Sequence, residues 1–105
     1  MQTLTYRFPA NRTPVRQVHV GVVASGDLEI LLDPSADSGH ADVRVSTSVG
    51  GFDVVWNELL ERFFARTPVS GRWELNDFGA NPDVVTLRLD QAAGAANGAG
   101  PRGRP

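Results

Sequence analysis

Residues 17 to 32 read QVHVGVVASGDLEILL, and this stretch organises the first half of the chain. Apolar residues alternate with polar or small ones on both sides of Ser25 and Gly26, which is typical of a hairpin of two half-buried strands. A two-residue turn would set the buried face of one strand against the exposed face of the other. A three-residue loop, 24–26, keeps the faces together and predicts three pairs: Val18 with Leu32, Val20 with Ile30 and Val22 with Leu28.

Ser25 is the middle residue of this loop, with its hydroxyl facing solvent, and Gly26 occupies the position that needs a left-handed backbone. A Gly-x-Ser-x-Gly nucleophile elbow is excluded, because Val23 and Asp27 stand where its glycines would be. Asp27 and Glu29 place negative charge beside the hydroxyl, but an exposed carboxylate is too weak a base to activate an alcohol without a histidine. The pattern predicts a serine that is presented but not activated, and an ordinary turn serine is the alternative.

Three further segments alternate like strands: residues 3–8 (TLTYRF), 43–49 (VRVSTSV) and 71–78 (GRWELNDF). Residues 34–42 form a turn-rich connector. The stretch 52–66, FDVVWNELLERFFAR, carries apolar residues at helical spacing, which predicts an amphipathic helix whose aromatic face packs on the sheet. The members of that face are Phe52, Val55, Trp56, Leu59, Leu60, Phe63 and Phe64.

Residues 81–93, NPDVVTLRLDQAA, are ambiguous between strand and helix. Asn81-Pro82 is a good helix start, whereas Val85, Leu87 and Leu89 alternate, which favours a short strand running into a helical end. From residue 94 the chain, GAANGAGPRGRP, has little to bury and is expected to be a disordered tail. The fold predicted is α+β: one domain over 1–93, with a small antiparallel sheet of about five strands packed by one main amphipathic helix, and with a strand or helix near the C-terminus.

Composition argues against several functions. The net charge is −2 and no Lys/Arg stripe is present, so nucleic-acid binding is not expected. Cysteine is absent, and the two histidines, His19 and His40, have no carboxylate at ligand spacing, so no metal site is expected. Neither a signal peptide nor a membrane span is evident, which predicts a cytoplasmic protein.

Two other features favour structural roles. The glycine-rich SVGGF, residues 48–52, precedes the predicted helix but lacks the lysine of a phosphate loop, so a plain strand-to-helix turn is the favoured interpretation. Asp77, in LNDFGANP, is expected to accept a backbone hydrogen bond in an Asx-type turn rather than to present its charge to a partner.

Three segments in the same order, GVVASGDLEILL, SVGGFDVVWNELLERFFAR and LNDFGANPDVVTLRL, resemble the acyl carrier (delta) subunit of biotin-independent malonate decarboxylase over about residues 1–93. That family is related in kind to the carrier subunit of citrate lyase. Ordinary acyl carrier proteins differ, because their serine lies in an Asp-Ser-Leu motif at a helix start. Alanine at position 24 departs from the glycine more usual in the family, which would affect the fit of the loop in a modifying enzyme.

The resemblance implies that Ser25 carries a covalent 2'-(5''-phosphoribosyl)-3'-dephospho-CoA group, installed by a prosthetic-group transferase. The thiol of that group would supply what a chain without cysteine lacks and would hold acetyl and malonyl thioesters. The implied partners are the acyltransferase and decarboxylase subunits of malonate decarboxylase and a malonyl-loading transferase. The chain itself would be a carrier subunit with no catalytic residue.

Two other functions remain alternatives. A citrate-lyase-type carrier shares the chemistry and differs in the acyl group. A small interaction module would use the sheet and exposed acidic residues to bind a partner, with Ser25 serving only the turn.

Overall fold

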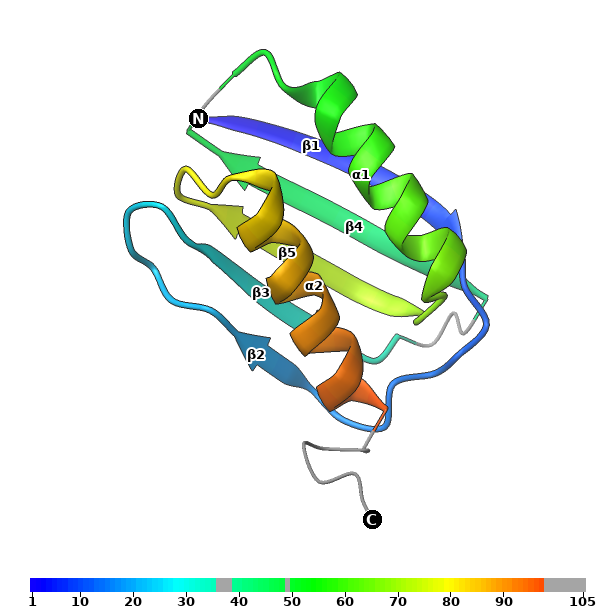
Figure 1. Cartoon of the computed structure of the whole chain (residues 1–105). Helices are drawn as coiled ribbons and strands as arrows, with labels where there is room; N and C mark the ends of the chain where they lie inside the picture. The colour runs from blue at the N-terminus through cyan, green and yellow to red at the C-terminus, as the bar shows by residue number, and fades with distance from the viewer. Residues whose placement is uncertain (36–38, 49, 98–105) are drawn as a thin grey trace.

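The computed structural model describes residues 1–35, 39–48 and 50–97. Five strands and two helices follow one another as β1 (Gln2–Pro9), β2 (Val18–Val20), β3 (Leu28–Asp33), β4 (His40–Thr47), α1 (Asp53–Arg66), β5 (Gly71–Asp77) and α2 (Pro82–Ala96). The strands form one sheet in the order β1-β4-β5-β3-β2, and both helices lie across the same face of it (Figure 1). The predicted α+β class is confirmed, with a second helix beside the expected one. No helix in these ranges is both long and apolar enough to cross a membrane.

The sheet is mixed, which corrects the expectation of an antiparallel sheet. Three of its strand pairs are antiparallel, but β4 and β5 run parallel, from Ala41 opposite Gly71 to Thr47 opposite Asp77. Parallel neighbours need a crossover connection, and α1 provides it. Alternation along a strand predicts which residues are buried but carries no information on strand direction.

The hairpin register is confirmed for Val18 opposite Leu32 and Val20 opposite Ile30, but the third predicted pair, Val22 with Leu28, does not form. Strand β2 ends at Val20, so the predicted three-residue loop is wrong and the connection runs over residues 21–27. The break comes at Gly21, which has φ +80° and lies so close to the Leu28 carbonyl that a Cβ there would be 1.9 Å from its oxygen. The chain therefore leaves the ladder two residues earlier than the pattern suggests.

The aromatic face of α1 packs on the sheet as predicted. Phe64 stacks on Phe8 of β1 with ring centroids 5.1 Å apart, and both Phe63 and Phe64 meet Trp73 of β5 edge to face at 5.9 and 5.2 Å. Two members of the predicted face are not in this core: Phe52 and Val55 are 49% and 47% exposed. The first turn of α1 thus extends beyond the packed aromatic cluster.

Residues 81–93 are helical from the start, so the strand favoured for 85–89 is a wrong prediction. The Asn81 side chain accepts a hydrogen bond from the backbone N–H of Val84 at 2.9 Å, and Pro82 occupies the first turn, where it costs no helical bond. Leu87, which created the strand-like alternation, is 52% exposed. The helix buries its other side against the sheet: Val85, Leu89, Ala92, Ala93 and Ala96.

The end of α2 also lies beyond the predicted domain boundary. The helix continues through Ala96, so residues 94–96 of the expected tail form its last turn, and the backbone N–H of Val15 donates to the Ala96 carbonyl at 2.8 Å. Asn97 is the C-cap residue of this helix. Residues 98–105 of the tail lie outside the described residues, as do residues 36–38 of the predicted connector and Val49 at the end of the predicted strand 43–49.

Candidate functional site

Ser25 lies in a four-residue turn at the tip of the β2–β3 connection. The backbone N–H of Asp27 donates to the Ala24 carbonyl at 3.1 Å, and Gly26, the third residue of the turn, has φ +83°. A positive φ at this position is what a type II turn requires. Ser25 is the second residue of the turn and is exposed, as expected. In the described part of the chain its hydroxyl forms no hydrogen bond, so the oxygen is open to another molecule.

The turn is fastened to the loop that joins β5 to α2. The backbone N–H of Gly26 donates to the Phe78 carbonyl at 2.7 Å, and the Phe78 N–H donates to the Asp27 carbonyl at 3.0 Å. These reciprocal bonds continue the pairing of β3 with β5 beyond its last ladder pair, Leu28 opposite Asp77. The serine is therefore held on a braced tip and not on a free loop (Figure 1).

Asp27 is the anchor of this arrangement. Its carboxylate receives two parallel bonds from Arg88 of α2, Nε to Oδ1 at 2.9 Å and Nη2 to Oδ2 at 2.8 Å. It also accepts the backbone N–H groups of Leu28 at 2.7 Å and Val22 at 3.2 Å. Both charged side chains are largely covered, Asp27 at 13% and Arg88 at 24% exposure. Planar, bidentate pairs of this kind fix orientation as well as charge.

The same contacts define the acid–base character of Asp27. The hydrogen bond from Arg88, helped by the backbone N–H of Leu28, lowers the pKa of Asp27 to about 2. A carboxylate with that pKa is a poorer proton acceptor than an ordinary one. The prediction that Asp27 does not activate Ser25 is thus strengthened, whereas its role as an anchor was missed. Arg88 lies 61 residues away, so no local pattern could have revealed the pair.

The other acidic neighbour, Glu29, is also engaged elsewhere. Its Oε2 lies 2.9 Å from His19 Nε2 on β2, and its Oε1 accepts from Asn76 Nδ2 on β5 at 3.0 Å. The second histidine, His40, lies beside Arg7, with Nδ1 3.1 Å from the guanidinium. Within the described ranges, no group of three or more His, Cys, Asp and Glu residues is placed to hold a metal ion.

Asp77 has the structural role that was predicted. Its Oδ1 accepts the backbone N–H groups of Gly79 at 3.2 Å and Ala80 at 2.9 Å, which is the geometry of an Asx-type turn. Its Oδ2 accepts from Thr47 Oγ1 at 2.8 Å. Asp77, 6% exposed, thereby ties the ends of β4 and β5 together and shapes the loop that braces Gly26.

Of the glycine-rich stretch 48–52, Ser48 directly follows β4 and residues 50–52 directly precede α1, while Val49 lies outside the described residues. Gly51 has φ +87°, and Phe52 is the N-cap residue, with no side-chain cap bond. Asp53 is the acidic residue of the first helical turn and already supplies negative charge at this helix end. The positive end of the helix dipole of α1 therefore needs no bound anion to balance it.

A groove of about 490 Å³ opens between the N-terminal ends of α1 and α2. We call it the inter-helix groove. Its floor is formed by Thr47 and Asp77, which lie in the same sheet row as Leu28, three residues after Ser25. Its walls are mainly apolar and include Phe52, Val55, Trp56, Leu59, Ala80 and Val85. The groove and the serine thus share one end of the sheet.

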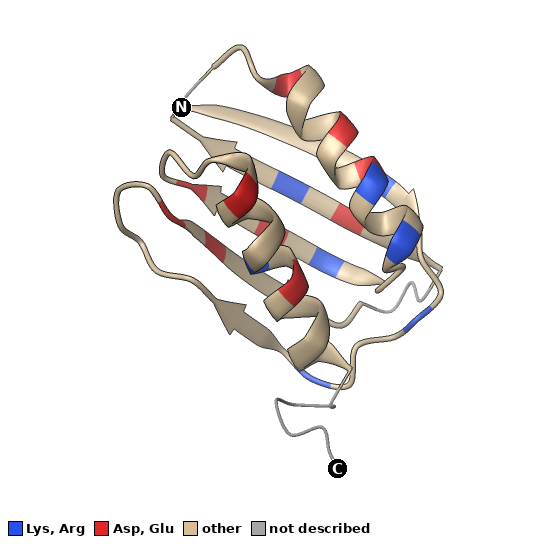
Figure 2. Cartoon of the chain, in the orientation of Figure 1, with Lys and Arg blue, Asp and Glu red and all other residues tan. Residues whose placement is uncertain are grey.

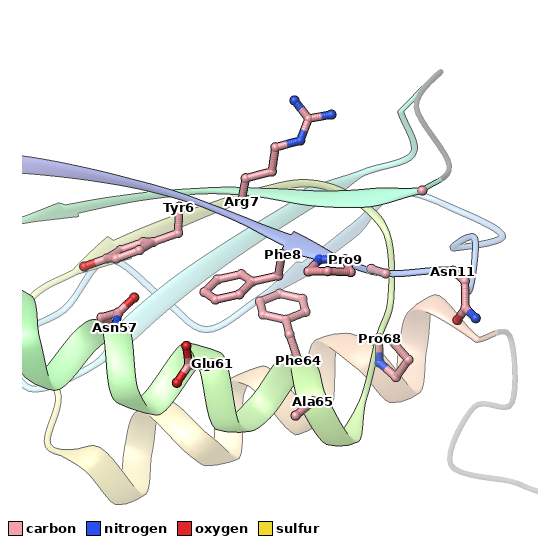
Figure 3. Close-up of a pocket in the computed structure, with 12 residues that line it drawn as sticks. Tyr6, Arg7, Phe8, Pro9, Asn11, Asn57, Glu61, Phe64, Ala65 and Pro68 are labelled. Carbon is pink, nitrogen blue, oxygen red and sulfur yellow. The ribbon is translucent and has the colours of Figure 1, made fainter.

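A larger cleft of about 760 Å³ lies at the opposite end of the sheet, between β1 and the second half of α1 (Figure 3). The stacked rings of Phe8 and Phe64 form its apolar side, while Asn57 and Glu61 line it from α1. Pro9 at its rim pairs with His40 at the start of β4, seven residues before Thr47. The larger of these two cavities therefore lies at the end of the sheet away from Ser25.

Charged residues of both signs lie along β4 and β5 (Figure 2), at strand positions that alternate with the buried ones and therefore face away from the helices. Arg7 on β1 lies 3.6 Å from Asp42 on β4, and Arg44 on β4 lies 3.5 Å from Glu74 on β5. Exposed pairs of this kind contribute little to stability. Because the charges alternate, this face shows none of the single-sign charge that steers a nucleic acid.

Comparisons with known proteins agree on one family. A model of the malonate decarboxylase delta subunit (MdcD) matches residues 15–96. The malonate decarboxylase acyl carrier protein of Pseudomonas savastanoi pv. phaseolicola is 47% identical over 92 residues, covering 87% of this chain and 92% of that protein. The protein of the same name from Stenotrophomonas maltophilia (strain R551-3) is 46% identical over 104 residues, covering 95% and 98%.

A solved structure shares the fold as well. A chain in the crystal structure of a Pseudomonas malonate decarboxylase hetero-tetramer in complex with malonate aligns with a TM-score of 0.85 and 42% identity. The alignment covers 91% of this chain and 99% of that one. The matches thus span the sheet, both helices and the Ser25 turn.

Proposed function

The chain belongs to the malonate decarboxylase delta subunit family, and we propose that it carries acetyl and malonyl groups on a phosphoribosyl-dephospho-CoA group esterified to Ser25. The observation that carries this proposal is the presentation of Ser25. Its hydroxyl is exposed on a braced turn, and neither of the nearby carboxylates is available as a base. A hydroxyl of this kind suits modification by another enzyme.

The residues present fit the prosthetic group. Ser25 is the second residue of a turn whose neighbours, Val22 and Val23, are also exposed, so a bulky phosphodiester meets no covering element. The full chain contains no cysteine, and the group, when bound, supplies the thiol on which an acyl thioester can form. The choice of acyl group follows the family, since the matched relatives are named for malonate decarboxylase and not for citrate lyase.

The chain's own residues position the serine and leave the proton chemistry to a partner. During attachment the Ser25 oxygen would bond to the phosphorus of an activated donor of the group, while a phosphoanhydride bond of that donor breaks and its phosphate leaving group departs. A base on the prosthetic-group transferase would accept the serine proton, because Asp27 is held by Arg88 and has a pKa of about 2. The bonds from Gly26 and Asp27 to Phe78 hold the turn while this happens. Preorganisation of a reacting group in this way lowers the entropic cost of the step.

The catalytic steps belong to partner subunits in this proposal. The solved neighbour is a chain of a hetero-tetramer, and by analogy we assign acyl exchange, malonyl loading and decarboxylation to acyltransferase and decarboxylase subunits and a malonyl-loading transferase. Decarboxylation develops charge on a carbonyl oxygen, which a partner's oxyanion site would stabilise. The carrier contributes position and reach.

The test is the intact mass of the full chain purified from cells growing on malonate, followed by peptide mapping of residues 17–33. We expect an adduct with the mass of phosphoribosyl-dephospho-CoA on Ser25, absent from Ser25→Ala and retained in the matched control Ser48→Ala, another exposed serine at this end of the sheet. An unmodified mass under these conditions would exclude the carrier mechanism. The interaction-module alternative would then be pursued through the open sheet face.

A further inference from the structure

The inter-helix groove has a location typical of ligand sites. It lies at the carboxyl ends of the parallel pair β4 and β5, between the starts of the helices that follow those strands. In open sheets with parallel strands this is where ligands bind. Its volume of about 490 Å³ is within the range of small-molecule pockets. Phe52 and Val55 leave about half their side-chain surface exposed at its walls, so apolar surface is available there.

The charges around the groove select against an anion. Asp77 forms part of the floor, and Asp53 and Asp83 occupy the first turns of α1 and α2. None of the described residues that line the groove is an arginine or a lysine, and Arg62 and Arg66 line the next pocket along the helices. Helix N-termini attract negative charge, but here each already has its own carboxylate, and the Asn81 side chain caps α2. A neutral, mainly apolar occupant fits this environment.

The groove is also connected to the Ser25 turn. Gly26 is bonded to Phe78, and the next two residues, Gly79 and Ala80, line the groove. A Cβ placed on Gly79 would lie 3.9 Å from the Gly26 nitrogen, so only this loop separates the turn from the groove. A long flexible group attached to Ser25 can cross the loop and place its far end between the helices.

We propose that the inter-helix groove binds the neutral acetyl-thioester end of the Ser25-linked arm and rejects the malonyl form, whose carboxylate would face Asp77 without a cation. This inference rests on the proposed function. It makes the carrier selective: the acetyl thioester is sheltered from water between cycles, while the malonyl group remains outside the groove, accessible to a decarboxylase subunit. Recognition is by charge and apolar contact, and no bond is made or broken in the groove.

The attachment of the arm to Ser25 determines how tightly the acetyl-thioester end must bind the groove. A group on a flexible linker experiences an effective concentration in the millimolar range. The free acetyl end must therefore bind with a Kd of about 1–10 mM or tighter for the tethered group to occupy the groove appreciably. This allows the groove to be tested on the unmodified full chain with S-acetylpantetheine as the probe, independently of whether Ser25 is loaded.

The chain has two tryptophans, and their indole N–H signals report on different places. Trp56 lines the groove, whereas the Trp73 indole donates to the Val69 carbonyl at 3.1 Å inside the core. In ¹⁵N NMR titrations to about 10 mM, S-acetylpantetheine should shift the Trp56 signal and leave Trp73 in place. S-malonylpantetheine should bind at least roughly fivefold more weakly, since one uncompensated like charge within a few ångströms suffices for that ratio.

A charge variant sharpens the test. Val55→Arg places a cation at the groove and should reverse the preference, so that S-malonylpantetheine binds more tightly than S-acetylpantetheine. Val54→Arg is the matched control: it adds the same charge to the same helical turn, but Val54 lies beside Leu4 and Tyr6 on the other side of α1. It should retain the wild-type preference.

The outcomes separate this inference from the proposed function. If the Trp56 signal does not move at about 10 mM S-acetylpantetheine, the proposal that the groove binds the acetyl-thioester end is overturned, because even a tethered group would then be mostly outside the groove. If S-acetylpantetheine and S-malonylpantetheine shift the Trp56 signal equally, the proposal that the groove rejects the malonyl form by its charge is overturned. An unmodified Ser25 in the mass measurement overturns the carrier function, whatever the titration shows.

Discussion

The two helices of this protein contribute in different ways. Helix α1 packs large aromatic side chains on the sheet, with Phe63 and Phe64 against Trp73, but its N-cap residue, Phe52, makes no side-chain cap bond. Helix α2 packs mostly small residues and is capped by Asn81, and from its surface Arg88 reaches the Ser25 turn. The comparison teaches that α1 mainly builds the core, whereas α2 mainly positions the site.

The largest effect is expected from removing an aromatic ring of α1. Phe63 is 1% exposed, so Phe63→Ala should lower the free energy of unfolding by about 3–5 kcal/mol, a large part of the 5–15 kcal/mol typical of a whole domain. Urea denaturation followed by tryptophan fluorescence measures the loss. Phe52→Ala, at the half-exposed start of the helix, should cost about 1 kcal/mol. Equal losses for the two variants would contradict the distinction between the packed aromatic cluster of α1 and its half-exposed start.

The same contrast explains what the sequence could predict. Large apolar residues at helical spacing identify α1, and alternation about Ser25 yields the register of β2 with β3. Helix α2 was misread because Leu87, an exposed leucine, continues an alternation that packing does not use. Small alanines on its buried face provide only a weak periodic signal. Local patterns therefore revealed the core helix better than the helix that serves the site.

The sequence predicted the exposed Ser25 itself but not the contacts and the groove that surround it. Exposure of Ser25 and the left-handed Gly26 follow from turn chemistry, which depends on neighbouring residues. The Asp27–Arg88 pair joins positions 61 residues apart, and the groove is formed by the ends of three separate segments. Contacts of this kind depend on topology, including the parallel direction of β5, which no spacing along the chain encodes.

Breaking the link from α2 to the turn should affect loading of Ser25 more than stability. Arg88→Met keeps the apolar stem and removes the guanidinium from Asp27. We expect the rate of Ser25 modification by the transferase to fall at least about tenfold, because a misplaced reacting group is slow to react. The Gly26 amide, bonded to Phe78, should exchange its hydrogen faster, and Arg88→Lys should restore part of the rate.

Arg72→Met is the matched control for this experiment, since Arg72 is exposed on β5, on the open face of the sheet. It should leave both the modification rate and the Gly26 exchange unchanged. A normal rate in Arg88→Met would show that the turn holds its shape without α2, and the two helices would then differ only in packing.

The Asp27–Arg88 pair should also weaken at acidic pH. The hydrogen bond from Arg88 is the chief cause that lowers the pKa of Asp27 to about 2, from an ordinary value of 3.8. The pair therefore contributes its full stability above about pH 4 and loses it progressively as the pH falls toward 2. Thermal unfolding of the wild type and of Asp27→Asn should differ most near neutral pH and converge toward pH 2. A difference that stays constant from pH 7 to pH 2 would contradict this assignment.

The smallest effect is expected at the helix starts, where the comparison is most direct. Asn81 Oδ1 accepts the Val84 N–H at 2.9 Å, so Asn81→Ala should cost about 1 kcal/mol, and Asn81→Asp, which retains the acceptor, should cost less. The change in free energy of unfolding of each variant is measured from the shift of its urea denaturation midpoint, provided that the slope of the free energy with urea concentration stays constant. Helix α1 has no side-chain cap bond to lose, and its first turn carries the charge of Asp53 instead. A neutral Asn81→Ala would mean that α2 is held by packing, and that its hold on the Ser25 turn derives from Arg88 and not from a well-defined helix end.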